Sequence, residues 1–168
     1  GIRYMTFWVW STENWERDKK EVEGMMRLFR YVIKRRWQRL HEKGVRVRVI
    51  GDTSKFPRDI QKALDDVVEQ TKNNKTITAV FALNYGGRDE IIRAIQRLHE
   101  NYHPPAGGSN FKLSEQNFVR YLDTSGIPDP ELIIRTGGEQ RLSGFLLWQS
   151  EYSELYFPSW YMPEFTAD

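Results

Sequence analysis

The sequence contains no cysteine. It can therefore form neither disulfide bonds nor thiolate sites, and we predict a cytoplasmic protein on this basis. No apolar run approaches the length of about 20 residues that a membrane-spanning helix needs. We also find no signal peptide, internal repeat or low-complexity segment.

A strong excess of charge of one sign is also missing, because 25 Lys and Arg residues stand against 23 Asp and Glu residues. A net charge of +2 produces no strong electrostatic field that would attract nucleic acid, so we predict no nucleic-acid partner. Aromatic residues are frequent, with six tryptophans, and they require either a large core or an apolar ligand. We predict one domain spanning residues 1–168, since this length supports a sizeable core.

Short β-type segments alternate with helix-type segments. The predicted strands are residues 4–10, 45–50, 77–83 and 132–134. Helices are predicted from Asp18 to Gly44, from Pro57 to about Asn73, and after Asp89 with Ile91, Ile92, Ile95 and Leu98 facing inward. Residues 103–108 read as a loop. This alternation predicts an α/β fold with a mostly parallel central sheet flanked by helices.

The helix after Asp18 is the longest predicted element. Asp18 followed by Glu21 predicts its capped start, and Gly44 predicts its end. An apolar stripe at helical spacing predicts its buried side: Val22, Met25, Met26, Phe29, Val32, Ile33, Trp37 and Leu40. Its cations are interpreted as solvated surface: Arg27, Arg30, Lys34, Arg35 and Arg39.

Polar clusters follow three of the predicted strands. They comprise residues 11–17, 84–89 and 135–143. Ligands of parallel α/β sheets bind beyond the carboxyl ends of the strands. We therefore expect the three clusters to converge at one edge of the sheet and to form the functional site.

The third cluster combines guanidinium groups, hydroxyls and glycines. Its members are Arg135, Thr136, Gly137, Gly138, Arg141 and Ser143. Such groups suit a small anion with several charges, and glycines can turn backbone N–H groups outward, so we predict a phosphate or diphosphate site. The alternative is that Arg135 and Arg141 pair with surface carboxylates around an ordinary turn.

The first cluster offers groups for catalysis. Asn14 can donate and accept hydrogen bonds, Ser11 can relay a proton and Arg17 can bind a diphosphate oxygen. Alternatively, Ser11 and Asn14 satisfy backbone groups of the loop and Trp15 belongs to the core. In the second cluster, two glycines before a helix can hold an anion or simply turn the chain.

The sequence of residues 128–149, followed by Tyr-Ser-Glu-Leu-Tyr-Phe at 152–157, resembles the cis-prenyltransferase signature. The best-known members of that family are the undecaprenyl diphosphate synthases. Residues 11–17 resemble its Ser-x-Glu-Asn-x-x-Arg motif, and Asn-Tyr-Gly-Gly-Arg at 84–88 resembles another. The resemblance therefore covers nearly the whole chain.

The resemblance implies roles for individual residues. Ser11, Asn14 and Arg17 would position the diphosphates and the condensing double bond as catalytic residues, and Trp15 would lie beside the allylic chain. The implied substrate-binding residues further along the chain are Asn84, Arg88, Arg135, Arg141 and Ser143. Glu154 matches an acidic residue associated with Mg²⁺, although a lone glutamate is normally a solvated surface charge.

The resemblance also implies an activity. Isopentenyl diphosphate would be condensed in cis onto an allylic diphosphate, farnesyl diphosphate being the expected starter, with Mg²⁺ as cofactor. The protein would form a homodimer and contact a membrane peripherally for product release. The long helix would wall a tunnel for the growing chain, with Val22, Met25, Met26 and Phe29 as lining or, alternatively, as ordinary core.

One family motif is absent. The Asp-Gly-Asn-Gly-Arg loop that carries the catalytic aspartate does not occur in these 168 residues. Because the sequence opens directly in a strand-like run, we expect an N-terminal strand and this loop to precede Gly1, and the chain alone to be inactive. The alternatives are a non-catalytic diphosphate-binding relative or partner subunit, and a nucleic-acid-binding α/β domain that uses the basic helix.

Overall fold

The computed structural model describes residues 1–101, 113–164 and 166. The chain divides into two compact units, residues 1–85 and residues 86–168. The loop predicted at residues 103–108 lies outside the described residues. The single domain that we inferred from the length stays a prediction.

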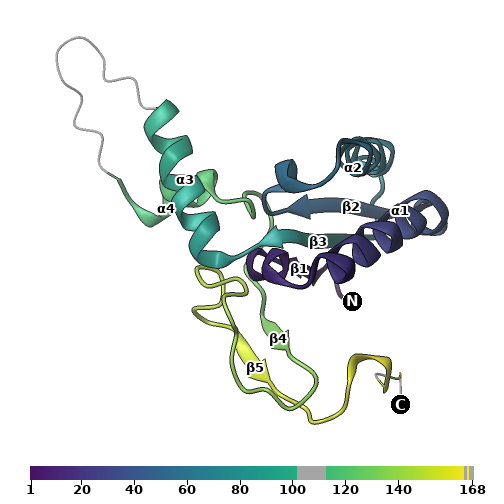
Figure 1. The fold of residues 1–168 in the computed structure, drawn as a ribbon. Coiled ribbons are helices and arrows are strands. Elements are labelled where there is room, and N and C mark those ends of the chain that lie inside the picture. The colour runs from purple at the N-terminus through teal and green to yellow at the C-terminus, as the bar shows by residue number, and fades with distance from the viewer. Residues whose placement is uncertain (102–112, 165, 167–168) are drawn as a thin grey trace. The chain divides into compact units, whose positions relative to one another are not determined.

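The first unit is built on a parallel three-stranded sheet (Figure 1). Its strands are β1 (Tyr4–Ser11), β2 (Val45–Ile50) and β3 (Ile77–Tyr85), in the order β1-β3-β2. The central position of β3 agrees with its near-continuous apolar sequence, because side chains on both faces of a central strand are covered. The predicted mostly parallel sheet with flanking helices is confirmed.

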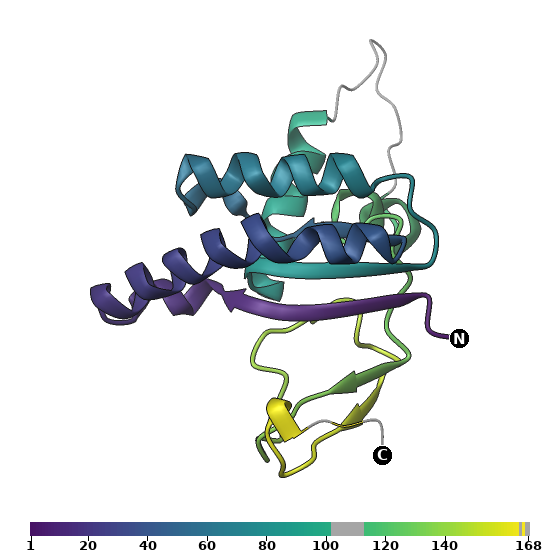
Figure 2. The same cartoon turned by 90° about the vertical axis from the view of Figure 1, so that its right-hand side faces the viewer.

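Two helices, α1 (Lys19–Glu42) and α2 (Arg58–Thr71), lie side by side on one face of this sheet (Figures 1 and 2). Two short 3₁₀ turns, η1 (Thr12–Glu16) and η2 (Thr53–Lys55), follow β1 and β2. The core between helices and sheet consists of Trp10, Met26, Phe29, Phe56, Ile60, Leu64 and Leu83. It anchors the strand ends from which the first polar cluster projects.

The ends of α1 follow the sequence signals. The Asp18 side chain accepts a hydrogen bond from the backbone N–H of Lys20 at 2.8 Å. Gly44 has a φ of +69°, and its N–H donates to the carbonyl of His41 at 2.8 Å. This left-handed conformation strains any residue with a Cβ, so glycine ends the helix. Glu21 pairs with Arg17, which differs from its predicted part in the cap.

The predicted buried stripe of α1 is confirmed in part, because five of its members are only half-buried: Val22, Met25, Ile33, Trp37 and Leu40. Met26 and Phe29 are buried, whereas Val32 is 42% exposed. The inward face therefore comes from the residues spaced three and four apart around Phe29.

The second unit contains two helices and two short paired strands. They are α3 (Gly87–Asn101), α4 (Glu115–Phe118), β4 (Leu132–Ile134) and β5 (Glu154–Tyr156), with 3₁₀ turns at η3 (Val119–Tyr121) and η4 (Met162–Glu164). The sequence placed β4 in the central sheet, but β4 pairs with β5 in a separate parallel ribbon. Only its middle residue, Ile133, is buried.

The buried side of α3 differs from the prediction. Ile92 and Ile95 are 57% and 48% exposed, whereas Ala94 and Glu90 are fully buried. Ala94 packs with Phe118 and Leu122, and Ile91, Leu98, Tyr121 and Trp148 surround this cluster. Apolar spacing misplaced the helix face because the inward face includes a carboxylate.

Candidate functional site

The first polar cluster forms a closed turn at the end of β1. Asn14 Oδ1 accepts a hydrogen bond from the backbone N–H of Ser11 at 2.8 Å, which supports the alternative that Asn14 satisfies the loop backbone. The Glu13 carboxyl lies in the same turn. Burial would raise its pKa, but hydrogen bonds from its own backbone and from the hydroxyls of Thr12 and Ser11 lower it.

Asn84 holds two loops together at the carboxyl edge of the sheet. Its Oδ1 accepts from Trp15 Nε1 at 2.8 Å, and its Nδ2 donates to the carbonyl of Asp52 at 2.7 Å. The side chain is 1% exposed and its φ is +49°. Asn84 therefore positions these two loops, and its predicted part in substrate binding stays a prediction.

Trp15 lies between the loop and the core. Its ring contacts Trp10 and Phe56 at centroid distances of 5.4 and 5.2 Å in edge-on arrangements. These contacts favour the core interpretation for most of the side chain. Arg17, by contrast, is 53% exposed and pairs with Glu21, so its guanidinium remains at the surface beyond the sheet edge.

In the second unit, the predicted arginine loop is folded around Arg135. The Arg135 Nη1 donates to Ser143 Oγ at 2.7 Å and to the carbonyl of Arg141. The exposed Arg141 pairs with Glu139, as the alternative reading of this turn expected. Ser143 has a φ of +49°, in the left-handed region, and its hydroxyl accepts the hydrogen bond from Arg135. Two cations and one hydroxyl thus stand together on this loop.

The glycines of this loop act differently from the prediction. We expected Gly137 and Gly138 to turn their N–H groups outward to a ligand. Instead they donate to the carbonyls of Trp160 and Pro158, at 2.8 and 2.9 Å. Their φ values of +90° and +77° explain why glycine is needed. The N–H groups of Gly137 and Gly138 are therefore engaged within the protein, and the predicted anion site depends on the side chains of the loop.

The arginine loop is attached to the first turn of α3. The N–H of Gly87 donates to the carbonyl of Gly144 at 2.7 Å. A Cβ on Gly87 would lie 2.8 Å from that carbonyl oxygen and 2.8 Å from Leu147 Cγ, so only glycine permits this approach. The exposed Arg88 follows immediately, which places a third cation at the start of the helix.

A buried polar network that the sequence did not predict fixes this arrangement. Glu90 accepts hydrogen bonds from the backbone N–H of Asp123 at 2.9 Å and from Gln149 Nε2 at 3.0 Å. Gln149 Nε2 also donates to Thr124 Oγ1 at 2.8 Å. The network joins α3 to both ends of the segment that carries the arginine loop. Its one sequence signal is Gln149, a polar residue that directly follows an apolar run.

Asp123 forms the charged part of this network. Arg93 binds it through two nitrogens at 2.7 and 2.6 Å, and Arg97 adds a third bond at 2.7 Å. Burial would raise the pKa of Asp123, but these guanidinium groups outweigh it and lower the pKa. Burial would likewise lower the pKa of Arg93, and its bonds to Asp123 and Asp89 raise it.

Glu154, the predicted metal ligand, is an exposed residue at the start of β5. Among the described residues, no group of three or more His, Asp or Glu side chains could hold a metal ion. A Mg²⁺ ion commonly binds to one or two carboxylates and to substrate phosphates. Glu154 suits that mode, in which the remaining ligands come from outside the chain.

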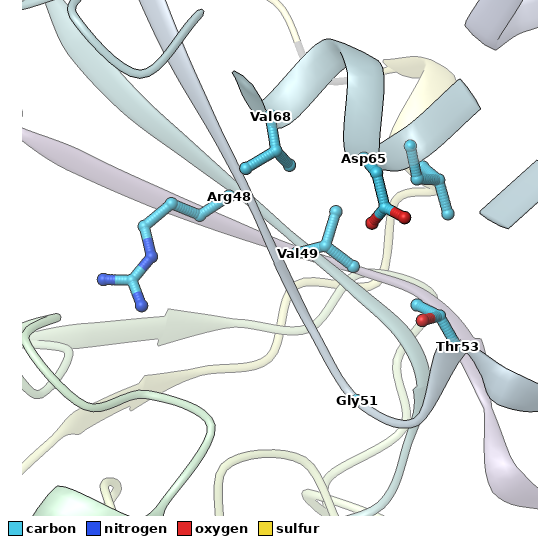
Figure 3. A pocket seen from close by; sticks show the side chains of 7 residues that line it. Arg48, Val49, Gly51, Thr53, Asp65 and Val68 are labelled. Atoms are coloured by element: carbon cyan, nitrogen blue, oxygen red, sulfur yellow. The ribbon is translucent and has the colours of Figure 1, made fainter. Parts of the chain in front are cut away.

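Two pockets of the first unit lie away from the predicted residues. One, of about 320 Å³, is bounded by β2 and α2 (Figure 3). Asp65 and Thr53 lie on the same side of it, and Arg48 points away from them (Figure 3). Burial lowers the pKa of Arg48, and Arg46 adds to this effect.

The second pocket, of about 520 Å³, lies between α1 and α2 and includes Ile33 and Trp37. The four predicted tunnel residues do not line it. Met26 and Phe29 belong to the core, and Val22 and Met25 pack against it. In this unit, these four side chains therefore follow the core alternative.

The structure thus groups the predicted residues into two sets. Ser11, Asn14, Trp15 and Asn84 meet at the sheet edge of the first unit. Arg135, Arg141 and Ser143 meet in the second unit, beside the helix that begins before Arg88. The convergence of all three clusters into one site stays a prediction.

Comparison with known proteins shows which relatives this chain resembles. The family model described as "Putative undecaprenyl diphosphate synthase" matches residues 1–168. The isoprenyl transferase of Clostridium perfringens is 45% identical over 169 residues, which cover 100% of this chain and 66% of that protein. The ditrans,polycis-undecaprenyl-diphosphate synthase of Micrococcus luteus, described as (2E,6E)-farnesyl-diphosphate specific, is 44% identical and is covered to 67%. The chain spans about two thirds of the length of these curated relatives.

Solved structures agree. A probable undecaprenyl diphosphate synthase from Campylobacter jejuni matches with a TM-score of 0.86 and 34% identity, over 98% of this chain and 74% of that one. Lavandulyl diphosphate synthase from Lavandula x intermedia, solved with dimethylallyl diphosphate, matches with a TM-score of 0.86 and 31% identity, over 98% of this chain and 71% of that one. The chain therefore belongs to the cis-prenyltransferase family, the family of the undecaprenyl diphosphate synthases.

Proposed function

We propose that this chain is part of an enzyme that condenses isopentenyl diphosphate units in cis onto an allylic diphosphate, with farnesyl diphosphate as the starter. The observation that carries the proposal is the arginine loop, in which Arg135 is bonded to Ser143 beside the exposed Arg141. Fork-shaped guanidinium groups bind diphosphate oxygens in pairs, which a single lysine cannot do. The relatives named for this chemistry support the same substrates.

In the proposed reaction, the double bond of isopentenyl diphosphate attacks the allylic carbon while the bond from that carbon to its diphosphate breaks. The diphosphate leaves with the electron pair, and a base or a diphosphate oxygen removes a proton from the isopentenyl unit. Arg135, Arg141 and Ser143 hold the diphosphate of isopentenyl diphosphate, and Arg88 adds charge at the start of α3. Fixed cations are effective here because they need no reorganisation as charge develops.

For the second substrate, the allylic diphosphate, Arg17 binds a diphosphate oxygen. Ser11 and Asn14 position the condensing groups. Glu154 would hold Mg²⁺, which neutralises diphosphate charge when it is bound. We further propose a cytoplasmic homodimer. The closed turn of Asn14 supports a positioning role, because its side chain fixes the path of the loop that carries Arg17.

The test uses the full-length protein that contains these residues, with farnesyl diphosphate, labelled isopentenyl diphosphate and Mg²⁺. Label in an organic-extractable product measures condensation. We expect Arg141→Ala to lower kcat/KM by about 100-fold or more, since it removes a cation that contacts substrate. Lys62→Ala, at an exposed position of α2, serves as the matched control.

Two results would contradict the proposal. One is full activity in Arg141→Ala. The other is no incorporation by a folded wild-type protein that still binds isopentenyl diphosphate, which would favour the non-catalytic relative or partner subunit instead.

A further inference from the structure

Two hydrogen bonds join the first turn of α3 to the segment that follows the arginine loop. One joins backbone atoms, from the Gly87 N–H to the Gly144 carbonyl at 2.7 Å. The other joins side chains, from Gln149 Nε2 to Glu90 Oε2 at 3.0 Å. On α3 the two bonds lie about one helical turn apart. One hydrogen bond alone acts as a pivot, whereas two separated bonds also fix the orientation of the segment against the helix.

Gln149 makes its bond inside the protein. The residue is 3% exposed, and Glu90 is fully buried. Gln149 Nε2 also donates to Thr124 Oγ1 at 2.8 Å, whereas no donor among the described residues reaches its Oε1. The amide nitrogen is therefore the group through which Gln149 holds its neighbours. An ionised carboxylate at this position could not replace it, because a carboxylate only accepts hydrogen bonds.

The cations of the predicted diphosphate site adjoin the backbone bond on both sides. Arg88 directly follows Gly87 on α3. Ser143 directly precedes Gly144 on the loop, and its hydroxyl accepts from Arg135 Nη1 at 2.7 Å. The position of α3 against this segment therefore sets the separation between Arg88 and Arg135.

That separation matters most for a ligand with two linked phosphoryl groups. Guanidinium groups bind phosphoryl oxygens through directed pairs of hydrogen bonds, so their spacing must match the ligand. A diphosphate can reach Arg88 and the arginine loop together. A monophosphate needs only the cations of the loop, and its binding should depend little on where α3 lies.

We propose that Gln149 is a positioning residue that makes this site selective for a diphosphate over a monophosphate. It acts through Glu90 and the segment after the loop, which together hold Arg88 and the arginine loop at the separation that two phosphoryl groups need. This role rests on the proposed function, because it takes isopentenyl diphosphate as the ligand of the arginine loop.

The test measures the dissociation constants of the full-length protein by calorimetry for isopentenyl diphosphate, isopentenyl monophosphate and farnesyl diphosphate. Gln149→Glu removes the donor and sets a second carboxylate against Glu90, so repulsion replaces the hydrogen bond. We expect the Kd of isopentenyl diphosphate to rise by about tenfold or more, as for one lost contact to a charged group. The other two Kd values should change by less than about twofold.

A double exchange tests the hydrogen bond itself. Glu90→Gln/Gln149→Glu reverses donor and acceptor and keeps the size and charge of the pair. The amide at position 90 can still accept from the Asp123 N–H through its oxygen, and its nitrogen can donate to position 149. We expect this variant to bind isopentenyl diphosphate within about threefold of wild type.

Gln96→Glu is the matched control, since it makes the same change at an exposed position of α3. It should bind all three ligands as wild type does. Circular dichroism verifies that every variant folds.

Three outcomes would overturn the positioning role. They are unchanged selectivity in Gln149→Glu, an equal loss for all three ligands, and no recovery of binding in the double exchange. Failure of the proposed reaction gives a different result. Wild-type protein that binds isopentenyl diphosphate without condensing it, while Gln149→Glu loses this binding, contradicts the reaction and supports the role of Gln149. Absence of wild-type binding to isopentenyl diphosphate overturns both.

Discussion

Single side chains connect the loops at the carboxyl edge of the first unit. Asn84 accepts from the Trp15 indole and donates to the Asp52 carbonyl while it is almost fully buried. An amide can do both because it has a donor and an acceptor on one planar group. The position of the loop that carries Arg17 therefore depends on a residue that touches no solvent.

We predict that Asn84→Ala lowers the free energy of unfolding by about 3 kcal/mol, because it removes a buried side chain together with its hydrogen bonds to the Trp15 indole and the Asp52 carbonyl. Urea unfolding followed by tryptophan fluorescence measures the change. Asn73→Ala, at an exposed position, should change stability by less than about 0.5 kcal/mol. Equal stability of Asn84→Ala and wild type would refute the positioning role.

Asp123 makes the stability of the second unit depend on pH. Its folded pKa is lowered by Arg93 and Arg97, so its contribution to stability is present above the ordinary aspartate pKa of about 3.9. That contribution is lost as the pH falls from there through the folded pKa, since the protonated form loses the ion pairs.

We therefore predict that Asp123→Asn lowers the free energy of unfolding at neutral pH by about 3 kcal/mol and flattens its decrease below about pH 4. Unfolding curves at a series of pH values measure both effects. Asp59→Asn serves as control, because its bonds to Arg30 lie at the surface and should contribute little. A parallel acid profile in Asp123→Asn and wild type would contradict the prediction.

At the scale of elements, Gly24 of α1 and Gly87 of α3 have opposite effects on the stability of their helices. Gly24 lies inside α1, where an added Cβ would meet only Arg27 Nη2 at 3.8 Å. Gly87 begins α3, where an added Cβ would collide with the carbonyl of Gly144. Glycine destabilises a helix interior because it has more conformational freedom in the unfolded chain. It is therefore unfavourable at position 24, whereas close packing requires it at position 87.

We predict that Gly24→Ala stabilises the protein by about 0.5–1 kcal/mol, because alanine has less freedom in the unfolded chain. Thermal unfolding measures the gain. Gly87→Ala should instead destabilise and also weaken the binding of inorganic diphosphate, because it pushes the arginine loop away from α3. The element-scale argument would be refuted by destabilisation in Gly24→Ala, or by unchanged diphosphate binding in Gly87→Ala.

At the scale of the whole molecule, the chain carries two sets of family residues on two units and lacks the Asp-Gly-Asn-Gly-Arg sequence. The arginine loop of the second unit is formed without that sequence, because Arg135 and Ser143 are hydrogen-bonded to each other within this unit. Binding of one diphosphate and catalysis should therefore be separable.

We predict that the 168-residue chain binds inorganic diphosphate yet incorporates no labelled isopentenyl diphosphate when farnesyl diphosphate and Mg²⁺ are present. Calorimetry measures binding, and product extraction measures incorporation. Arg135→Ala should abolish the binding signal, whereas Lys75→Ala should leave it unchanged. Turnover by the chain alone would show that the aspartate loop is dispensable.

The family, the parallel α/β class, the ends of α1 and the residues of the arginine loop could all be predicted from the amino-acid sequence. These features depend on short stretches of chain, namely a turn, a cap or a continuous motif, whose chemistry is local. Gly44 is one example, because a left-handed helix end favours glycine and the residue type therefore indicates where the helix stops.

The polar groups that face inward, and the partners that they bind, depend on tertiary packing. Glu90, Gln149 and Asp123 are far apart in the sequence, and each alone resembles a surface residue, so their buried network could not be predicted. The same holds for the pairing of β4 with β5 and for the occupied N–H groups of Gly137 and Gly138. Burial and hydrogen-bond partners are properties of distant segments brought together, and neither periodicity nor composition specifies them.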